Sequence, residues 1–256
     1  MTSPLETLVR SLHTRKGRER RGLTLAEGIR LVEEVLAAGV PIKSVMISPA
    51  LGHTPRGEAL SQAIRARVSR VEEVDDRQLA GLASTEHPQG IIAVIQPATS
   101  GLEAIRVGGR SVVLVLDAVQ DPGNVGTMVR TALALGAAGV VALPGTAELG
   151  NPKVLRAAMG ATFRLPAVAA SPEAFLSWTA ATGQSVWVAS GEGDPVQSAT
   201  DRGAVALVLG NEGAGVGADL ARAARRAVAI PLRGRAESLN VGVAAGILLW
   251  ELLRDR

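Results

Sequence analysis

A loop that leads directly into a predicted helix near residue 122 carries side chains suited to phosphate or hydroxyl chemistry. Asn124 and Gly126 lie at the mouth of this helix, and Arg130 lies about one turn inside it. Helix N-termini offer free N–H groups and positive potential, which favours an anion. The glycine spacing fits neither the dinucleotide motif nor the P-loop. A tight turn followed by an ordinary exposed arginine would explain the same residues, so this loop alone leaves both interpretations open.

A second loop, residues 207–217, follows a fully apolar run and holds four glycines and one acid, Glu212. Glycines allow the backbone to approach a ligand closely. A carboxylate in such a place needs either a partner or solvent. A glycine-rich turn with a solvated glutamate is the structural alternative.

A third pair of polar residues, Ser238 and Asn240, precedes the predicted C-terminal helix. Both residue types cap helix N-termini, and capping is their simplest role. The helix itself begins with small residues between 242 and 246 that allow close packing. Each of the three loops is a weak signal alone, but their combination favours a single site.

The pattern of elements predicts an α/β fold in which the three loops converge. From residue 110 onward, continuous apolar runs alternate with helical patterns, as in a parallel sheet buried on both faces. Ligands bind beyond the carboxyl ends of the strands in such sheets, and all three loops fall at such ends. We therefore predict an N-terminal α/β domain over 1–98, a linker over 99–109 and a C-terminal parallel-sheet domain over 110–256. The Pro, Ser and Gly content of residues 97–109 marks this boundary.

The composition excludes several classes of protein. With 47% hydrophobic residues the chain can build a sizeable core. The absence of cysteine excludes disulfides, thiolate metal sites and cysteine nucleophiles. No apolar run reaches membrane-spanning length and no N-terminal leader is recognisable, so we expect a soluble, cytoplasmic protein without a membrane partner or a bound metal.

The basic residues are almost all arginine, and the sequence pI is about 10.1. Arginine binds phosphate through a planar fork that lysine lacks. A dense basic run near the N-terminus suits a polyanion such as RNA, although solvated surface charge and biased codon usage explain the same residues. The candidates for RNA contacts are Arg15, Arg18, Arg20, Arg21 and Arg30.

On these motifs the second half resembles the SpoU, or TrmH-type, RNA ribose methyltransferases of the SPOUT superfamily. Asn124 and Arg130 correspond to the first motif, the segment LGNEG with Gly210 and Glu212 to the second, and IPL…ESLNV to the third. The N-terminal half is similar to the ribosomal-protein-like substrate-binding domain of ribosomal RNA members, notably in AEGIRLVEEVLAAG and EHPQGIIAVI.

The resemblance implies a fold, a cofactor and an activity. It implies a deep trefoil knot in the C-terminal domain and a homodimer formed through that domain, so that each active site draws on both subunits. The activity implied is methylation of a ribose 2′-hydroxyl in structured RNA, with ribosomal RNA favoured by the extra domain. The catalytic residues implied are Asn124, Arg130, Glu212, Ser238 and Asn240. S-adenosylmethionine would be held mainly by main chain around Leu209, Gly210, Ile230, Leu232 and Leu239.

Alternatives remain open for the identity of the proton acceptor and for the class of function. A hydroxyl is a poor nucleophile until its proton is removed, yet a charged guanidinium offers no acceptor. Arg130 therefore acts either as a base of lowered pKa or as a phosphate clamp while another group or water takes the proton. A noncatalytic RNA-binding or ribosome-assembly factor and a transfer RNA ribose methyltransferase remain alternatives. A nicotinamide enzyme lacks support, because its glycine fingerprint and acidic partner are missing.

Overall fold

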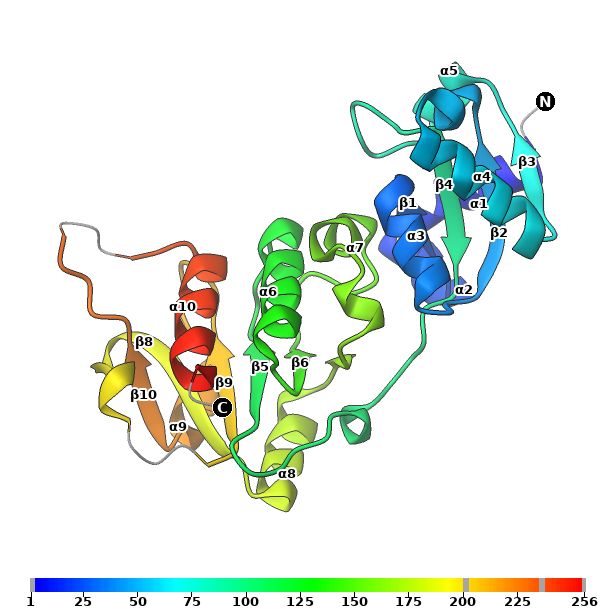
Figure 1. The fold of residues 1–256 in the computed structure, drawn as a ribbon. Helices are drawn as coiled ribbons and strands as arrows, with labels where there is room; N and C mark the ends of the chain where they lie inside the picture. The colour runs from blue at the N-terminus through cyan, green and yellow to red at the C-terminus, as the bar shows by residue number, and fades with distance from the viewer. Residues whose placement is uncertain (1–2, 200–202, 235–237, 255–256) are drawn as a thin grey trace. The chain divides into compact units, whose positions relative to one another are not determined.

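The computed structural model describes residues 3–199, 203–234 and 238–254. The chain divides into two compact units, which are described separately (Figure 1). Unit 1 comprises Met1–Ala98 and Gly150–Phe163, and unit 2 comprises Thr99–Leu149 and Arg164–Arg256. No helix in these described ranges is both long enough and apolar enough to span a bilayer.

Unit 1 is built on a four-stranded sheet in the order β1-β4-β2-β3. The central strand β4 runs antiparallel to β1 and β2, whereas β2 and β3 are parallel. The strands are β1 (Thr24–Glu27), β2 (Ile42–Ile47), β3 (Val71–Glu73) and β4 (Ile91–Ile95). The helices are α1 (Pro4–Leu12), α2 (Arg15–Arg21), α3 (Ile29–Ala37), α4 (Pro55–Arg67), α5 (Asp76–Ala80) and α7 (Pro152–Ala158).

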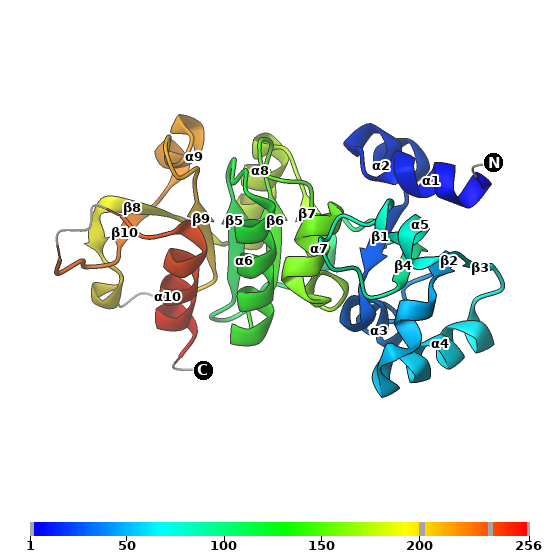
Figure 2. The ribbon, with the colours of Figure 1, turned by 90° about the horizontal axis from the view of Figure 1, so that it is seen from above.

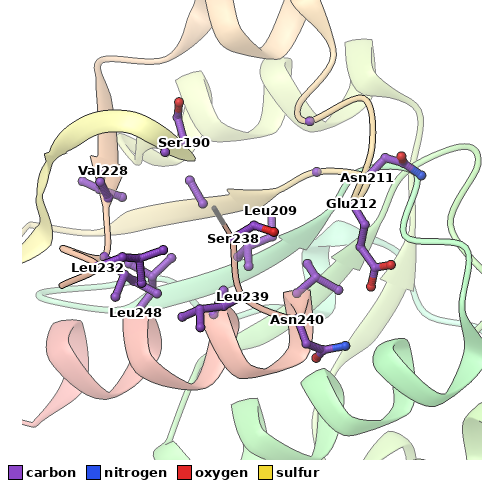
Figure 3. A pocket seen from close by; sticks show the side chains of 18 residues that line it. Ser190, Leu209, Asn211, Glu212, Val228, Leu232, Ser238, Leu239, Asn240 and Leu248 are labelled. Carbon is purple, nitrogen blue, oxygen red and sulfur yellow. The ribbon is translucent and has the colours of Figure 1, made fainter. Parts of the chain in front are cut away.

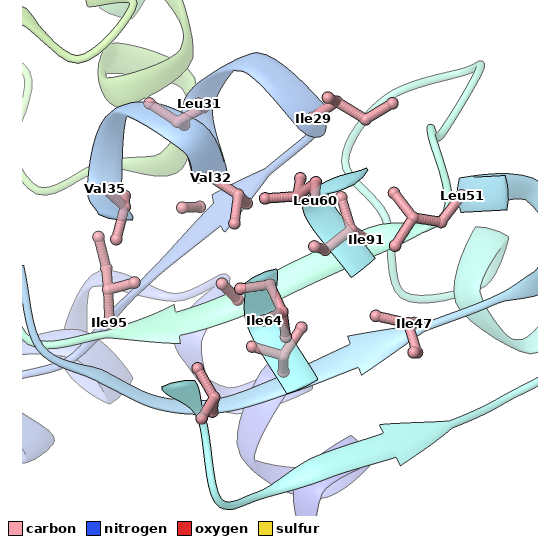
Figure 4. Packing of buried hydrophobic residues seen from close by; sticks show 14 of the residues in the cluster. Ile29, Leu31, Val32, Val35, Ile47, Leu51, Leu60, Ile64, Ile91 and Ile95 are labelled. Atoms are coloured by element: carbon pink, nitrogen blue, oxygen red, sulfur yellow. The ribbon is translucent and has the colours of Figure 1, made fainter. Parts of the chain in front are cut away.

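Alternating side chains of the central strand enter two different hydrophobic clusters in unit 1. Ile91, Ala93 and Ile95 pack with α3 and α4, whereas Ile92 and Val94 join the cluster that contains α1 (Figure 4). This alternation is the two-residue period of a strand, and all five residues of β4 are buried. Strand β4 is therefore covered on both faces, which explains why IIAVI is a continuous apolar run in the sequence.

The segment Gly150–Phe163, which the sequence analysis placed in the C-terminal domain, packs in unit 1. Thr24 Oγ1 donates a hydrogen bond of 2.6 Å to the carbonyl of Gly150. Leu155 of α7 joins the same cluster as α3 and α4, and Arg156 Nη1 donates to Ser84 Oγ at 2.9 Å. The sequence indicates that this segment is a helix with an apolar face, but a periodic pattern does not indicate which core that face enters.

Unit 2 is an α/β structure with a six-stranded sheet in the order β10-β8-β9-β5-β6-β7. Every pairing in it is parallel, so the predicted fold class is confirmed. The central strands β5 and β9 are buried along their whole length. The strands are β5 (Val112–Leu116), β6 (Gly139–Ala142), β7 (Ala167–Ala169), β8 (Ser185–Pro195), β9 (Val205–Leu209) and β10 (Arg226–Ala229).

Helices cover both faces of the unit 2 sheet. Figure 2 shows α6 and α10 on one side and α8 and α9 on the other. These helices are α6 (Pro122–Leu135), α8 (Pro172–Thr182), α9 (Ala218–Ala223) and α10 (Val241–Leu253). Residues 99–109, expected as a linker, belong to unit 2, because Ile105 is only 4% exposed and packs in its core beside Gly139.

Candidate active site

The three polar loops of the sequence meet beyond the carboxyl ends of β5 and β9. Asn124 Nδ2 donates a hydrogen bond of 2.5 Å to Glu212 Oε1. Asn240 Nδ2 in turn donates to Asn124 Oδ1 at 3.0 Å. These residues are 88 and 116 positions apart in the sequence, so the contacts are made by the fold. Asn124 therefore joins the second loop to the third.

The helix caps fix these side chains in place. Asp121 Oδ1 accepts the N–H of Asn124 at 2.7 Å and caps α6, which begins at Pro122. Asn240 caps α10, because its Oδ1 accepts the N–H groups of Gly242 and Val243 at 2.9 and 3.2 Å. The cap uses the side-chain oxygen of Asn240 and leaves its amide nitrogen for Asn124. Capping and the site therefore depend on the same residue.

A cavity of about 440 Å³ lies between the ends of β9 and β10 and the start of α10 (Figure 3). The predicted cofactor residues all line it, as do three of the predicted catalytic residues. They are Leu209, Gly210, Ile230, Leu232 and Leu239, together with Glu212, Ser238 and Asn240. Its wall is apolar where Leu209, Leu239 and Leu248 meet and polar toward Glu212 and Asn240.

Sequence reasoning missed one wall of this cavity. In the β8–β10 pairing, Ala227 faces Val188 but Val228 faces Asp194, so the register shifts and residues 189–193 form a bulge within β8. Ala189, Ser190 and Gly191 of this bulge line the cavity. The glycines and polar residues of SGEGDP, directly after the apolar first half of β8, are the signal that could have located it.

Gly210 allows the second loop to close on itself. A Cβ atom at this position would lie 2.2 Å from both the carbonyl carbon and the oxygen of Gly215. Asn211 and Gly215 exchange backbone hydrogen bonds of 3.0 and 2.9 Å across the loop. Only glycine fits at Gly210 without displacing this backbone, which forms part of the cavity wall.

Two of the predicted catalytic residues, Asn124 and Arg130, do not line the cavity. Asn124 is hydrogen-bonded to Glu212 and Asn240, which do line it. Arg130 lies farther along α6. It is exposed on α6 and is absent from the cavity wall. At helical spacing it shares the solvent face of α6 with Thr127 and Ala134, which are also exposed. Thr127 lies beside Gly242 of α10, since its methyl carbon would be 3.7 Å from a Cβ there. Arg130 therefore lies on the surface that α6 shares with α10.

Four of the five arginines predicted to contact RNA are exposed in unit 1, namely Arg15, Arg20, Arg21 and Arg30. Arg18 differs, because it is only 5% exposed. Its Nη1 donates hydrogen bonds of 3.0 Å to the carbonyls of Leu12 and His13 at the end of α1. These bonds satisfy carbonyls that a helix end leaves open, so Arg18 has a structural role in the fold.

Two family models match the chain. The SpoU rRNA Methylase family matches residues 111–250, more than half of the sequence. This chain belongs to that family. The MRM3-like substrate binding domain matches residues 8–93 of the same SpoU methylase. In the part of the chain that the structure describes, no group of three or more His, Asp or Glu side chains could hold a metal ion.

Relatives extend over nearly the whole SpoU methylase chain. The 23S rRNA (guanosine(2553)-2′-O)-methyltransferase RlmP of Bacillus subtilis is 37% identical over 244 residues, which cover 95% of this chain and 93% of that protein. The AdoMet-bound rRNA methyltransferase of Sinorhizobium meliloti has a TM-score of 0.88 and 32% identity, covering 100% of this chain and 96% of that one. AviRb of Streptomyces viridochromogenes in complex with AdoMet also has a TM-score of 0.88, at 26% identity over 99% of this chain and 98% of that one.

Proposed function

We propose that this SpoU methylase transfers a methyl group from S-adenosylmethionine to a ribose 2′-hydroxyl of ribosomal RNA. The observation that carries the proposal is the junction of three sequence-distant loops at Asn124, beside a cavity that the second and third of these loops line together with β10 and residues 189–191. Family membership and relatives named as 23S rRNA 2′-O-methyltransferases support the substrate. A ribosomal RNA substrate also supports the cytoplasm as the place of action.

The cavity suits the proposed methyl donor. Its volume of about 440 Å³ falls within the usual range for small-molecule sites. The leucines of its wall suit an apolar ring system, and the backbone at Gly210 and Ile230 supplies polar groups. When bound, the donor supplies a methyl group on a sulfonium, so the protein has to orient the acceptor and manage its proton.

Within the site, the Glu212–Asn124–Asn240 chain of hydrogen bonds would act by positioning. Asn124 has both its amide nitrogen and its carbonyl oxygen engaged, which fixes its orientation. Glu212 is the only carboxylate among the residues that line the cavity, and it is exposed. We therefore favour Arg130 as a phosphate clamp for the target nucleotide, with Glu212 or a water as the proton acceptor, since a charged guanidinium accepts no proton.

A homodimer would bring Arg130 to a cavity. Four large apolar side chains are exposed in the described ranges, and three of them lie on α10: Val243 at 52%, Ile247 at 37% and Trp250 at 56%. Exposed apolar clusters mark interaction sites. This strip continues across Thr127 toward Arg130 on α6. We propose that two copies pack through α6 and α10 and that Arg130 serves the partner's cavity. The trefoil knot stays a prediction from the family resemblance.

The exposed arginines of α2 and α3 would hold RNA in unit 1. Arg15 is paired with Glu19 at 2.7 Å, whereas Arg20, Arg21 and Arg30 are exposed cations on the same unit. Phosphate contacts release counterions, so affinity for RNA should fall steeply as salt rises. A flat salt response would remove this surface from the proposal.

Mass-spectrometric mapping of ribose methylation tests the function directly. Ribosomal and transfer RNA would be compared from cells with and without the gene for this chain, and then after treatment of the unmodified RNA with purified protein. We expect one 2′-O-methyl nucleotide in 23S rRNA to depend on the protein in both experiments. If the 2′-O-methyl nucleotide that depends on the protein lies in transfer RNA, the substrate is transfer RNA and not ribosomal RNA. A protein that binds RNA but modifies none would indicate the noncatalytic alternative.

A further inference from the structure

The carboxylate of Asp117 ties the loop that carries Glu212 to the end of β5. Asp117 directly follows β5, and its N–H donates to the carbonyl of Leu209 at 2.9 Å, which continues the β5–β9 pairing by one residue. Its Oδ2 accepts the N–H of Gly217 at 2.7 Å. Gly217 closes the second loop and is the N-cap residue of α9. The bond therefore joins positions 100 residues apart at the far end of the loop.

The near end of the same loop is tied to the neighbouring residue. Asn211 Nδ2 donates a hydrogen bond of 3.0 Å to the carbonyl of Ala118. Ala118 has a φ of 56°, in the left-handed region that L-residues rarely adopt, and this turn presents its carbonyl to the loop. Asn211 Oδ1 also accepts the N–H groups of Gly213 and Ala214. Both ends of the loop are thus fixed to residues 117 and 118.

Between these two ties lies Glu212, which accepts the Asn124 amide. Gly210, Asn211, Glu212 and Gly215 of the loop all line the cavity, whereas Asp117 does not. Asp117 is half-buried and is the first side chain beyond β5. Movement of the Gly217 end would therefore displace both the Glu212 carboxylate and the cavity backbone.

We infer that Asp117 is a positioning residue, which holds loop 210–217 so that Glu212 and the loop backbone are aligned for methyl transfer. Its effect on turnover rests on the proposed function, but its effect on the loop does not. The required group is an acceptor at Oδ2 rather than a negative charge. Asp117→Asn can still offer an oxygen to the Gly217 N–H, whereas Asp117→Ala cannot.

The test compares Asp117→Ala and Asp117→Asn with a matched control, Asp219→Ala. Asp219 is exposed in the first turn of α9 and forms an ion pair with Arg222 three residues on. Hydrogen exchange measured by mass spectrometry, without cofactor or RNA, should show faster exchange in peptides spanning 211–217 for Asp117→Ala alone. Equal exchange in Asp117→Ala and Asp219→Ala would overturn the inference.

Kinetics then separate positioning from a general loss of stability. At a temperature where all variants are folded, we expect kcat of Asp117→Ala to fall about tenfold or more, because small misplacements of reacting groups are costly. The KM for RNA should stay within twofold, and Asp117→Asn should recover most of the rate. Wild-type kcat in Asp117→Ala, or equal losses in the alanine and asparagine variants, would contradict the role. If the wild type methylates no RNA, the proposed function fails. Hydrogen exchange still tests whether the bond from the Gly217 N–H to Asp117 holds the loop.

Discussion

Units 1 and 2 each hold a glutamate that joins segments far apart in sequence, and the two carboxylates are used differently. Glu27 in unit 1 is only 6% exposed. Its two oxygens accept the N–H and hydroxyl groups of both Ser84 and Thr85, and Arg156 Nη1 lies 3.7 Å from Oε2. Glu212 in unit 2 is exposed and accepts the amide of Asn124 through Oε1.

The difference separates a carboxylate that holds a fold from one that is available for chemistry. Both carboxylate oxygens of Glu27 accept hydrogen bonds, and Oε2 also forms an ion pair with Arg156. Glu27 therefore fixes the loop after α5 and the helix α7. Among the residues that the structure describes, none donates to Oε2 of Glu212, and this oxygen can meet a substrate or water. A buried carboxylate whose oxygens are hydrogen-bonded, such as Glu27, has a structural role. An exposed carboxylate beside a cavity, such as Glu212, is a candidate site residue.

The first prediction concerns Glu27→Ala, which should destabilise unit 1 by about 3 kcal/mol, because the partly buried donors of Ser84 and Thr85 lose their acceptor. All three tryptophans lie in unit 2, at positions 178, 187 and 250, so fluorescence reports on that unit. We expect an early urea transition by circular dichroism but an unchanged fluorescence transition. Glu73→Ala is the control, since Glu73 is an exposed partner of Arg65. Equal urea midpoints for Glu27→Ala and Glu73→Ala would contradict the structural role of Glu27.

Arg130→Lys should remove most methyl transfer, by about a hundredfold, because lysine keeps the charge but lacks the planar fork. The Kd for S-adenosylmethionine should stay within twofold of the wild type. Arg222→Lys, another exposed arginine of unit 2, is the control. Methyl incorporation from labelled donor into ribosomal RNA is the measurement, and unimpaired turnover would exclude Arg130 from the mechanism.

Glu212→Gln should lower kcat about tenfold. It should change the free energy of unfolding by less than about 0.5 kcal/mol, because the residue is exposed. Mixing this variant with Arg130→Lys sharpens the test. If Arg130 serves the partner's cavity, mixed dimers contain one intact site, and the mixture should be more active than either variant. A mixture no more active than its components would indicate that both residues act within one chain.

The smallest expected effect is the pH dependence of Glu27. Burial raises the pKa of its carboxyl, but hydrogen bonds from Thr85 and Ser84 and the charge of Arg156 together lower the pKa below its ordinary 4.5. A lowered pKa in the folded state gives stability that is present above 4.5 and is lost as the pH falls through the folded-state value. The stability difference between wild type and Glu27→Gln should therefore narrow below pH 4.5 in urea titrations. A difference that widens on acidification would reverse this assignment.

The sequence predicts the local features of the site better than its long-range ones. Apolar runs located the central strands β5 and β9, and the polar residues after them are the ones that meet at Asn124. The bulge in β8 escaped prediction because it is a register shift against β10, a partner strand more than thirty positions away. Arg18 was predicted as an RNA contact because residue type alone does not reveal the carbonyls that it meets in the fold.

Calorimetric titration with S-adenosylmethionine, comparing wild type with Gly210→Ala, tests most directly that the loops of unit 2 enclose the methyl donor. A Cβ at this position meets the Gly215 backbone at 2.2 Å, so the loop has to move. We predict one donor per chain for the wild type and at least about tenfold weaker binding for Gly210→Ala, with Asp219→Ala unchanged. Absence of binding to the wild type, or equal affinity in both proteins, would contradict the account.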